Sequence, residues 1–336
     1  MSYQAQPGAR NVTPAVRSFL RDARRGLSLP IPGHGNTPER FRALRGEAAK
    51  DASVGRLFEA HTDAITILFE ASMPPPPMTA LAVWASGPAK SSFVEKDGGR
   101  FVLNGRRAFC GGASVVDAAL VITDSPEGER LILVDLRQPG VIVDSGVWKA
   151  EAFRDAGIST VHFTNVEVGP DAFVGPPGWY GSRPGFWYGA VGVAAMWAGI
   201  SDSLLARLPG LRRYNDDISD AATGSIEASM WAVSALLDQA GTQIDAPPDT
   251  ERTGGFGPGR DGWSRDTHGF ESAKTIALAC RHTVRLLLES AISAFDEEVG
   301  PAAVAFDPEL ARARAELTMS LAQTHRARDL VALAQP

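Results

Sequence analysis

The sequence predicts an α+β protein in which a helical segment is followed by a compact run of β-strands and then by a helical bundle. Three observations predict this order: helical periodicity before a run of prolines, several short β-rich segments after it, and long amphipathic stretches in the second half. The expected domains are an N-terminal helical domain at 1–74, a central antiparallel β-barrel domain at 78–175 and a C-terminal helical bundle at 180–336.

Helical spacing defines the first segment. Apolar residues recur there every three or four positions and form one face, which comprises Val54, Leu57, Phe58, Ala64, Ile65, Leu68 and Phe69. Asp51 precedes this face as an N-cap, because its carboxylate can accept hydrogen bonds from the first turn. His61 lies on the same face, which favours a hydrogen-bonded core histidine over a catalytic one. Four prolines at 74–77 then end the helix, because proline lacks the backbone N–H that a helix needs.

The central segment has the pattern of short antiparallel strands. β-Branched runs such as RFVLNG, AALVITD and RLILVDL follow one another closely, with turn dipeptides at Asn104-Gly105 and Pro139-Gly140. No helical pattern interrupts these runs, so an antiparallel barrel or sandwich is favoured over a βαβ unit.

The second half of the chain returns to helical periodicity. Small residues dominate the string GAVGVAAMWAG, so neighbouring helices can approach it closely. Three later stretches are amphipathic and begin at Ile226, Glu271 and Pro308. A Gly/Pro-rich segment at 250–266 interrupts this predicted bundle.

Composition and spacing exclude several classes of function. The net charge is −6, and the basic residues are scattered, which argues against a nucleic-acid surface. Cys110 and Cys280 lack CxxC spacing, and His268 and His282 lack ligand spacing with carboxylates, so we expect no disulfide and no metal site. The N-terminus lacks a signal-peptide pattern, and no apolar run reaches about 18 residues. We therefore expect a cytoplasmic protein that binds neither nucleic acid nor a membrane.

Four strings carry a resemblance to a known family. They are GRFVLNGRRAFCGGASVVDAALVITD (99–124), RDAGISTVHFTNVEVGPDAFVG (154–175), SRPGFWYGAVGVAAMWAGISDSLL (182–205) and, near the C-terminus, DPELARARAELTMSLAQTHRARDLVALA. In this order they resemble the acyl-CoA dehydrogenase family, of which the chain looks like a short, atypical bacterial-type member. The resemblance implies an acyl-CoA dehydrogenase-like fold, bound FAD, a small-molecule substrate such as an acyl-CoA, and a homodimer or homotetramer.

The segment around residue 110 is the expected flavin contact. Phe109 supplies one flat ring, and Cys110, Gly111 and Gly112 follow it without bulky side chains. Main-chain amides in such a stretch can reach the polar edge of an isoalloxazine ring. The resemblance implies that Phe109 lies against the flavin. The residues alone leave a second interpretation open, in which Phe109 is a core aromatic residue of the barrel.

A second flavin contact is expected at the start of the β-rich region. The resemblance places Val83 and Trp84 at a flavin-contact loop, where this chain reads WASGPAKS. The alternative from the residues alone is that Trp84 is a surface tryptophan of a strand.

Candidate catalytic residues lie in the predicted bundle. Arg183 matches the arginine at the head of the family's first bundle helix, where its guanidinium could hold a carbonyl or carboxylate; a helix-start ion pair is the open alternative. The family's reaction needs a glutamate to remove an α-proton, but Thr324 and Ser182 occupy the two places where the resemblance puts it. His325 is the expected replacement base, because imidazole titrates near neutral pH. Its alternative is a solvated surface histidine.

These observations support three hypotheses about function. The first is an FAD-dependent oxidoreductase that acts on the CH–CH bond of an acyl thioester or similar substrate, with an electron acceptor that the sequence does not define. The second is a flavin-dependent monooxygenase on the same fold, favoured by the missing glutamate and by His325. The third is a catalytically degenerate protein that binds flavin or acyl-CoA, or serves as a partner subunit.

Overall fold

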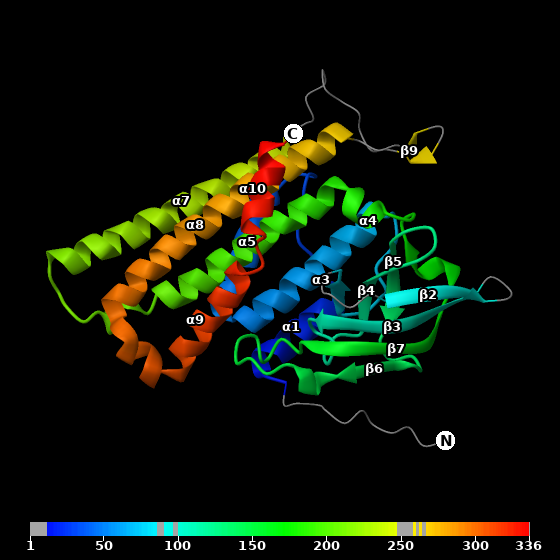
Figure 1. The fold of residues 1–336 in the computed structure, drawn as a ribbon, viewed down its shortest axis with the longest axis horizontal. Helices are drawn as coiled ribbons and strands as arrows, with labels where there is room; N and C mark the ends of the chain where they lie inside the picture. The colour runs from blue at the N-terminus through cyan, green and yellow to red at the C-terminus, as the bar shows by residue number, and fades with distance from the viewer. Residues whose placement is uncertain are drawn as a thin grey trace. The chain divides into compact units, whose positions relative to one another are not determined.

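The computed structural model describes residues 12–85, 91–96, 100–246, 258–259, 262–263 and 267–335 (Figure 1). The chain divides into two compact units. Unit 1 comprises Met1–Ser28 and Arg56–Gly181, and unit 2 comprises Leu29–Gly55 and Ser182–Pro336. Helices, strands and helices follow one another along the chain in the predicted order. The first predicted domain contributes to both units, and the division into three domains stays a prediction.

Residues next to the first helices explain where these helices begin. Helix α1 (Pro14–Arg24) begins at Thr13, whose hydroxyl accepts a hydrogen bond from the Val16 amide, with Pro14 at its first position. Helix α3 (Ala52–Glu70) starts in unit 2 and continues into unit 1. The predicted cap at Asp51 is confirmed, because its carboxylate accepts the Val54 amide at 2.9 Å.

Unit 1 contains two four-stranded sheets. The first has the order β1-β4-β5-β8 and consists of Leu81–Trp84, Ala118–Thr123, Arg130–Asp135 and Phe173–Val174. The second has the order β2-β3-β7-β6 and consists of Ser91–Lys96, Arg100–Cys110, Ser159–Val168 and Val141–Asp144. Two short 3-10 turns, Ser145–Val147 and Pro170–Ala172, lie between these strands.

One strand pair departs from the predicted antiparallel arrangement. β1 and β4 run parallel, whereas the other pairs within the two sheets are antiparallel. The chain leaves β1, forms β2 and β3 in the other sheet, and returns as β4 in the same direction. All six residues of β4 are buried, as expected for a central strand that is covered on both faces.

Unit 2 is helical. Its helices are α2 (Thr37–Lys50), α5 (Pro184–Leu205), α6 (Leu208–Leu211), α7 (Asp217–Asp245), α8 (Thr267–Phe306), α9 (Pro308–Leu321) and α10 (Arg326–Ala334). The four-residue α4 (Trp179–Ser182) ends where unit 2 resumes. Apart from β9 (Pro258–Gly259) and β10 (Gly262–Trp263), the predicted Gly/Pro-rich segment at 250–266 lies outside the described residues.

Helix α5 is the core of unit 2 and packs against α2 and α8. The close approach predicted from its small residues is present at Gly199, where an added Cβ would collide with the Arg45 carbonyl of α2. Arg45 also binds Asp202 of α5 through two hydrogen bonds of 2.6 and 2.8 Å. The stretch Pro184–Leu211 is long and apolar enough to cross a membrane, but 67% of its apolar window is buried inside the protein, as in the core helix of a globular bundle.

Candidate functional site

A β-bulge at the end of β3 presents Phe109. The β3–β7 ladder pairs Arg107 with Val161 and Cys110 with Ser159, so β3 contains one extra residue at this point. Phe109 has a φ of 57°, a left-handed conformation that is uncommon for a bulky residue, and 59% of it is exposed. The interpretation of Phe109 as a core aromatic residue is therefore wrong. Strained backbone and bulges concentrate at functional sites, so this exposed ring is a candidate contact for a flat ligand.

The residues after the bulge differ in what they can offer a ligand. Cys110 is fully buried and its thiol donates to the Arg107 carbonyl at 3.3 Å, while burial raises the pKa of the thiol to about 12. Its side chain is therefore neutral and unreactive. Gly111 has nothing within 4 Å of the position that a Cβ would take, so open space lies beside the chain. Gly112 has a φ of 76°, and its Cβ would meet Val116 at 2.9 Å.

Main-chain amides of this turn are partly used within the chain. The Gly112 amide donates to the Ala156 carbonyl at 2.8 Å, and the Ala113 amide donates to the Cys110 carbonyl at 3.3 Å. The expectation that the amides of this stretch are available to a flavin is therefore wrong for these two donors. The open side of Gly111 and the exposed Phe109 remain as candidate ligand contacts.

Trp84 supports the turn from the interior of unit 1. Its indole N–H donates to the Gly111 carbonyl at 2.9 Å, and only 2% of the residue is exposed. The interpretation of Trp84 as a surface residue is wrong, because β1 is apolar throughout and is buried at this position. The neighbouring Val83 is half-buried and pairs with Leu120 of β4. The loop expected at WASGPAKS lies largely outside the described residues.

Arg107 is a buried cation beside the bulge, and the sequence patterns did not identify it as a candidate site residue. Arg107 is 4% exposed, and its guanidinium donates to the Trp84 carbonyl at 3.3 Å. Burial lowers the pKa of Arg107, and the nearby charges of Asp124 and Glu129 oppose this effect. The Arg106-Arg107 pair within a strand was the available signal, because strand alternation turns one of the two side chains inward.

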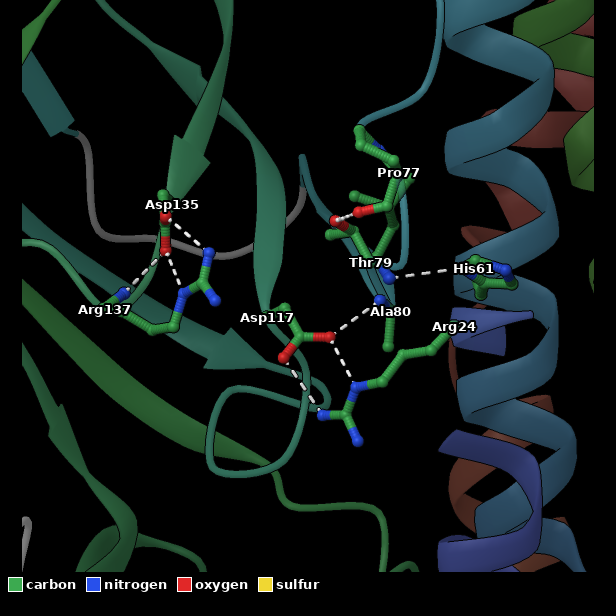
Figure 2. A network of polar contacts seen from close by, with 9 residues as sticks. Arg24, His61, Pro77, Thr79, Ala80, Asp117, Asp135 and Arg137 are labelled. Atoms are coloured by element: carbon green, nitrogen blue, oxygen red, sulfur yellow. Dashed lines mark hydrogen bonds and ion pairs between the residues drawn. The ribbon is translucent and has the colours of Figure 1, made fainter. Parts of the chain in front are cut away.

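A polar network fixes where β1 begins (Figure 2). Asp117 accepts the Ala80 amide at 2.8 Å and binds the guanidinium of Arg24 through bonds of 2.9 and 3.0 Å. His61 accepts the Leu81 amide at Nδ1 and donates from Nε2 to the Leu27 carbonyl, so its tautomer is defined. Burial lowers the pKa of His61 to about 4. The expected core histidine is confirmed, and this network positions the strand that carries Trp84.

The candidate catalytic residues of unit 2 have different environments. Arg183 is 7% exposed and occupies the N-cap position of α5. His325 is exposed and occupies the N-cap position of α10, where its backbone amide donates to Asp329 at 3.1 Å. Thr324 donates from its hydroxyl to the Leu321 carbonyl at 2.9 Å. His325 thus has the solvated setting that the sequence left open, while its catalytic role stays a prediction.

Buried carboxylates are the remaining candidates for a general base. In the described ranges, Glu59 and Glu316 are the carboxylates with buried side chains. Glu59 pairs with Arg56 at 2.9 Å, and Glu316 pairs with Arg312 at 2.9 Å. Both carboxylates are thus held in ion pairs within their own helices, which favours a structural role. Among the residues whose placement is described, no group of three potential metal ligands occurs.

Comparison with known proteins places this architecture in a class. The chain has an acyl-CoA dehydrogenase-like fold, in which helices flank a central β-region. The dibenzothiophene monooxygenase TdsC of Paenibacillus sp. A11-2, in complex with FMN and indole, matches with a TM-score of 0.76 and 16% identity over 95% of this chain and 94% of that chain. The methanesulfinate monooxygenase MsuC of Pseudomonas fluorescens matches with a TM-score of 0.76 and 15% identity over 96% and 89% of the two chains.

Sequence comparison gives a partial match. The dibenzothiophene monooxygenase of Rhodococcus qingshengii is 30% identical over 178 residues, covering 45% of this chain and 42% of the relative. The match thus spans less than half the length of that relative. No family model matches the chain.

Proposed function

We propose that the chain is a flavin-dependent monooxygenase that oxygenates a small organic molecule. The observation that carries this proposal is that the partial sequence match and the full-length fold similarity both lead to proteins named as monooxygenases. They favour the second hypothesis from the sequence over the expected acyl-CoA dehydrogenase.

The residues of the chain support the same choice. Dehydrogenation of an acyl thioester needs a base to remove the α-proton, and Thr324 and Ser182 stand at the two positions where the family's glutamate is expected. The buried carboxylates Glu59 and Glu316 are held in ion pairs. Transfer of an oxygen atom to an electron-rich heteroatom or ring does not require such a base.

FMN is the proposed flavin, in place of the expected FAD, because two solved structures of TdsC are described as complexes with FMN. The structure offers features that fit a flat cofactor: the exposed ring of Phe109 and the open side of Gly111. Phe109 would lie against the isoalloxazine, with Trp84 and Gly112 holding the turn from behind. Reduced flavin supplies the electrons that activate dioxygen, with one oxygen atom passing to the substrate and the other leaving as water.

Arg183 and His325 keep their proposed roles as substrate-facing groups. The buried Arg183 at the head of α5 would hold an electron-rich group of the substrate. The imidazole of His325 would act as the proton-transfer group. A His325→Ala variant that keeps full turnover would remove this residue from the mechanism.

The test uses purified protein reconstituted separately with FMN and FAD. We expect tighter binding of FMN, and, with reduced FMN, oxygen and dibenzothiophene, a product that carries one ¹⁸O atom from ¹⁸O₂ in mass spectrometry. Anaerobic bleaching of bound flavin by acyl-CoA compounds, without oxygen insertion, would support the dehydrogenase hypothesis instead. A protein that binds neither flavin would support the degenerate-subunit hypothesis.

Self-association is proposed through α7. Exposed residues recur there at intervals of three and four positions and form an uncharged stripe, comprising Ala221, Gly224, Ala228, Trp231 and Ala235. Trp231 is 75% exposed, and tryptophan often anchors protein interfaces. The small neighbours would let the same helix of a second copy approach closely. Light scattering should show a homodimer or homotetramer, and Trp231→Arg should shift it toward the monomer.

A cytoplasmic location is also proposed. Both cysteines, Cys110 and Cys280, are buried and free, which fits a reducing compartment.

A further inference from the structure

Aromatic side chains gather at the head of α5, within unit 2. The rings of Phe186 and Trp187 meet edge to face, with centroids 5.3 Å apart and an interplanar angle of 87°. Phe270, near the start of α8, meets Trp187 with centroids 6.1 Å apart and an angle of 67°. All three residues are only half-buried, so the protein does not fully enclose this cluster. A further planar ring can pack against such side chains in an offset-stacked or edge-to-face arrangement.

Trp187 also has an unused hydrogen-bond donor. Its Nε1 atom is buried and has no acceptor among the described residues. A buried N–H almost always has a partner, and an exception requires an explanation. The indole nitrogen can only donate, so the missing partner must be an acceptor.

A second indole in unit 2 shows that an unused donor does not by itself mark a ligand site. The Nε1 atom of Trp197 is also buried without an acceptor, but the whole residue is enclosed at 0% exposure. The guanidinium of Arg281 lies over its ring, 5.1 Å from the centroid. A ligand can therefore reach the surroundings of Trp187 but not those of Trp197, which makes the two residues a matched pair.

We propose that the head of α5 binds a planar aromatic molecule carrying a hydrogen-bond acceptor, which Trp187 orients through its indole N–H. The rings of Phe186 and Phe270 supply the apolar walls, and the buried Arg183 at the N-cap of the same helix adds a positive charge nearby. Trp187 is a specificity-determining residue in this proposal. The assignment of the ligand as substrate or product rests on the proposed monooxygenase function. Oxygenation of an aromatic sulfide creates such an acceptor, because the product carries a sulfoxide oxygen.

The test compares two ligands that differ by one acceptor. Binding of dibenzothiophene and of dibenzothiophene sulfoxide is measured by equilibrium dialysis on protein without added flavin. Trp187→Phe keeps an aromatic ring and removes the N–H. It should weaken sulfoxide binding about threefold to tenfold and change dibenzothiophene binding less than twofold. The matched control Trp197→Phe also removes an unused N–H and should change neither affinity.

Each outcome bears on the proposal. Equal losses for both ligands in Trp187→Phe, or no loss for the sulfoxide, would overturn the donor role. Wild-type protein that binds neither ligand would overturn the site. Phe270→Leu removes one aromatic wall and should weaken both ligands, which tests the site if Trp187→Phe fails to fold. Because these measurements need no flavin and no turnover, their failure is distinguishable from failure of oxygen insertion.

Discussion

Trp84, which supports the turn after β3 in unit 1, and Trp187, at the head of α5 in unit 2, each have a buried indole N–H, but of these two only that of Trp84 has an acceptor among the described residues. Trp84 donates to the Gly111 carbonyl at 2.9 Å, whereas the Nε1 atom of Trp187 has no acceptor in the described part of the chain. Trp84 is 2% exposed and Trp187 is half-buried. The two tryptophans thus differ both in whether the indole N–H has an acceptor and in how exposed the residue is.

This difference indicates a structural role for Trp84 and a ligand-binding role for Trp187. Around Trp84, the indole N–H and two nearby main-chain amides have acceptors within unit 1, as the bonds from Gly112 to Ala156 and from Ala80 to Asp117 show. The side chain of Trp84 thus has its hydrogen bond without a ligand and supports the turn that follows Phe109. Around Trp187 the described residues provide no acceptor and the residue is half-buried, so in our proposal a molecule from outside supplies the acceptor. We expect substitution of Trp84 to change mainly the free energy of unfolding and substitution of Trp187 to change mainly ligand binding.

The largest expected effect is at Trp84. Trp84→Ala should lower the free energy of unfolding by about 3–5 kcal/mol, because a fully buried ring is removed from a packed core. Trp187→Ala should cost less, because its ring is partly exposed already. Urea denaturation followed by circular dichroism measures both, with Trp231→Ala as an exposed control expected within about 0.5 kcal/mol of wild type. Equal losses at Trp84 and Trp187 would break the comparison.

The network behind β1 should make stability depend on pH. Burial holds the pKa of His61 in the folded protein at about 4, below its ordinary 6.5. The unfolded chain therefore binds the proton more readily, so the stabilisation is complete above pH 6.5 and is lost as the pH falls toward 4. The loss should approach about 3 kcal/mol.

The matched variant is His61→Gln, whose amide can accept from Leu81 and donate to Leu27 without titrating. Its unfolding free energy should vary less between pH 6.5 and 4 than that of wild type, as measured by urea titration at each pH. A slope identical to that of wild type would show that another group causes the acid sensitivity.

Local patterns predicted much of the fold, because helix periodicity, caps and proline breaks act over a few residues. Leu57 and Leu68 of α3 are buried as predicted, and Asp51 caps that helix. The prediction that Phe69 lies on the buried face is wrong, because Phe69 is 51% exposed. Ile67 completes the buried face instead. The parallel pairing of β1 with β4 depends on a return from the other sheet, which no local pattern encodes.

The candidate site was predicted in part for the same reason. The aromatic-then-glycine string identified Phe109, but its exposure depends on a bulge against β7. The burial of Trp84 was not predictable, because LAVW is apolar throughout and lacks the alternation that assigns faces. The unused donor of Trp187 depends on which acceptors surround it in space, and its sequence neighbourhood contains no sign of it.

Two adjacent glycines sharpen the comparison within unit 1. Gly112→Ala should lower the free energy of unfolding by about 1–3 kcal/mol, because φ is 76° and the new methyl would lie 2.9 Å from Val116. Gly111→Ala should change it by less than about 0.5 kcal/mol, because the space beside it is open. Flavin titration should show the reverse order, with the larger relative loss of affinity in the Gly111 variant. A Gly111 variant that binds flavin like wild type would place the cofactor elsewhere.

Substitution of Phe109 is expected to have the smallest effect on the free energy of unfolding and the largest effect on flavin binding. Phe109→Ala and Phe109→Gly both remove a ring that is 59% exposed, so little packing is lost. The glycine variant should be the more stable of the two, because glycine adopts a φ of 57° without the strain that alanine retains. Both variants should lose flavin to a similar degree, measured by absorbance after dialysis, because the ring and not the backbone strain is the proposed contact. Unchanged flavin content in both would show that the bulge at the end of β3 has only a structural role.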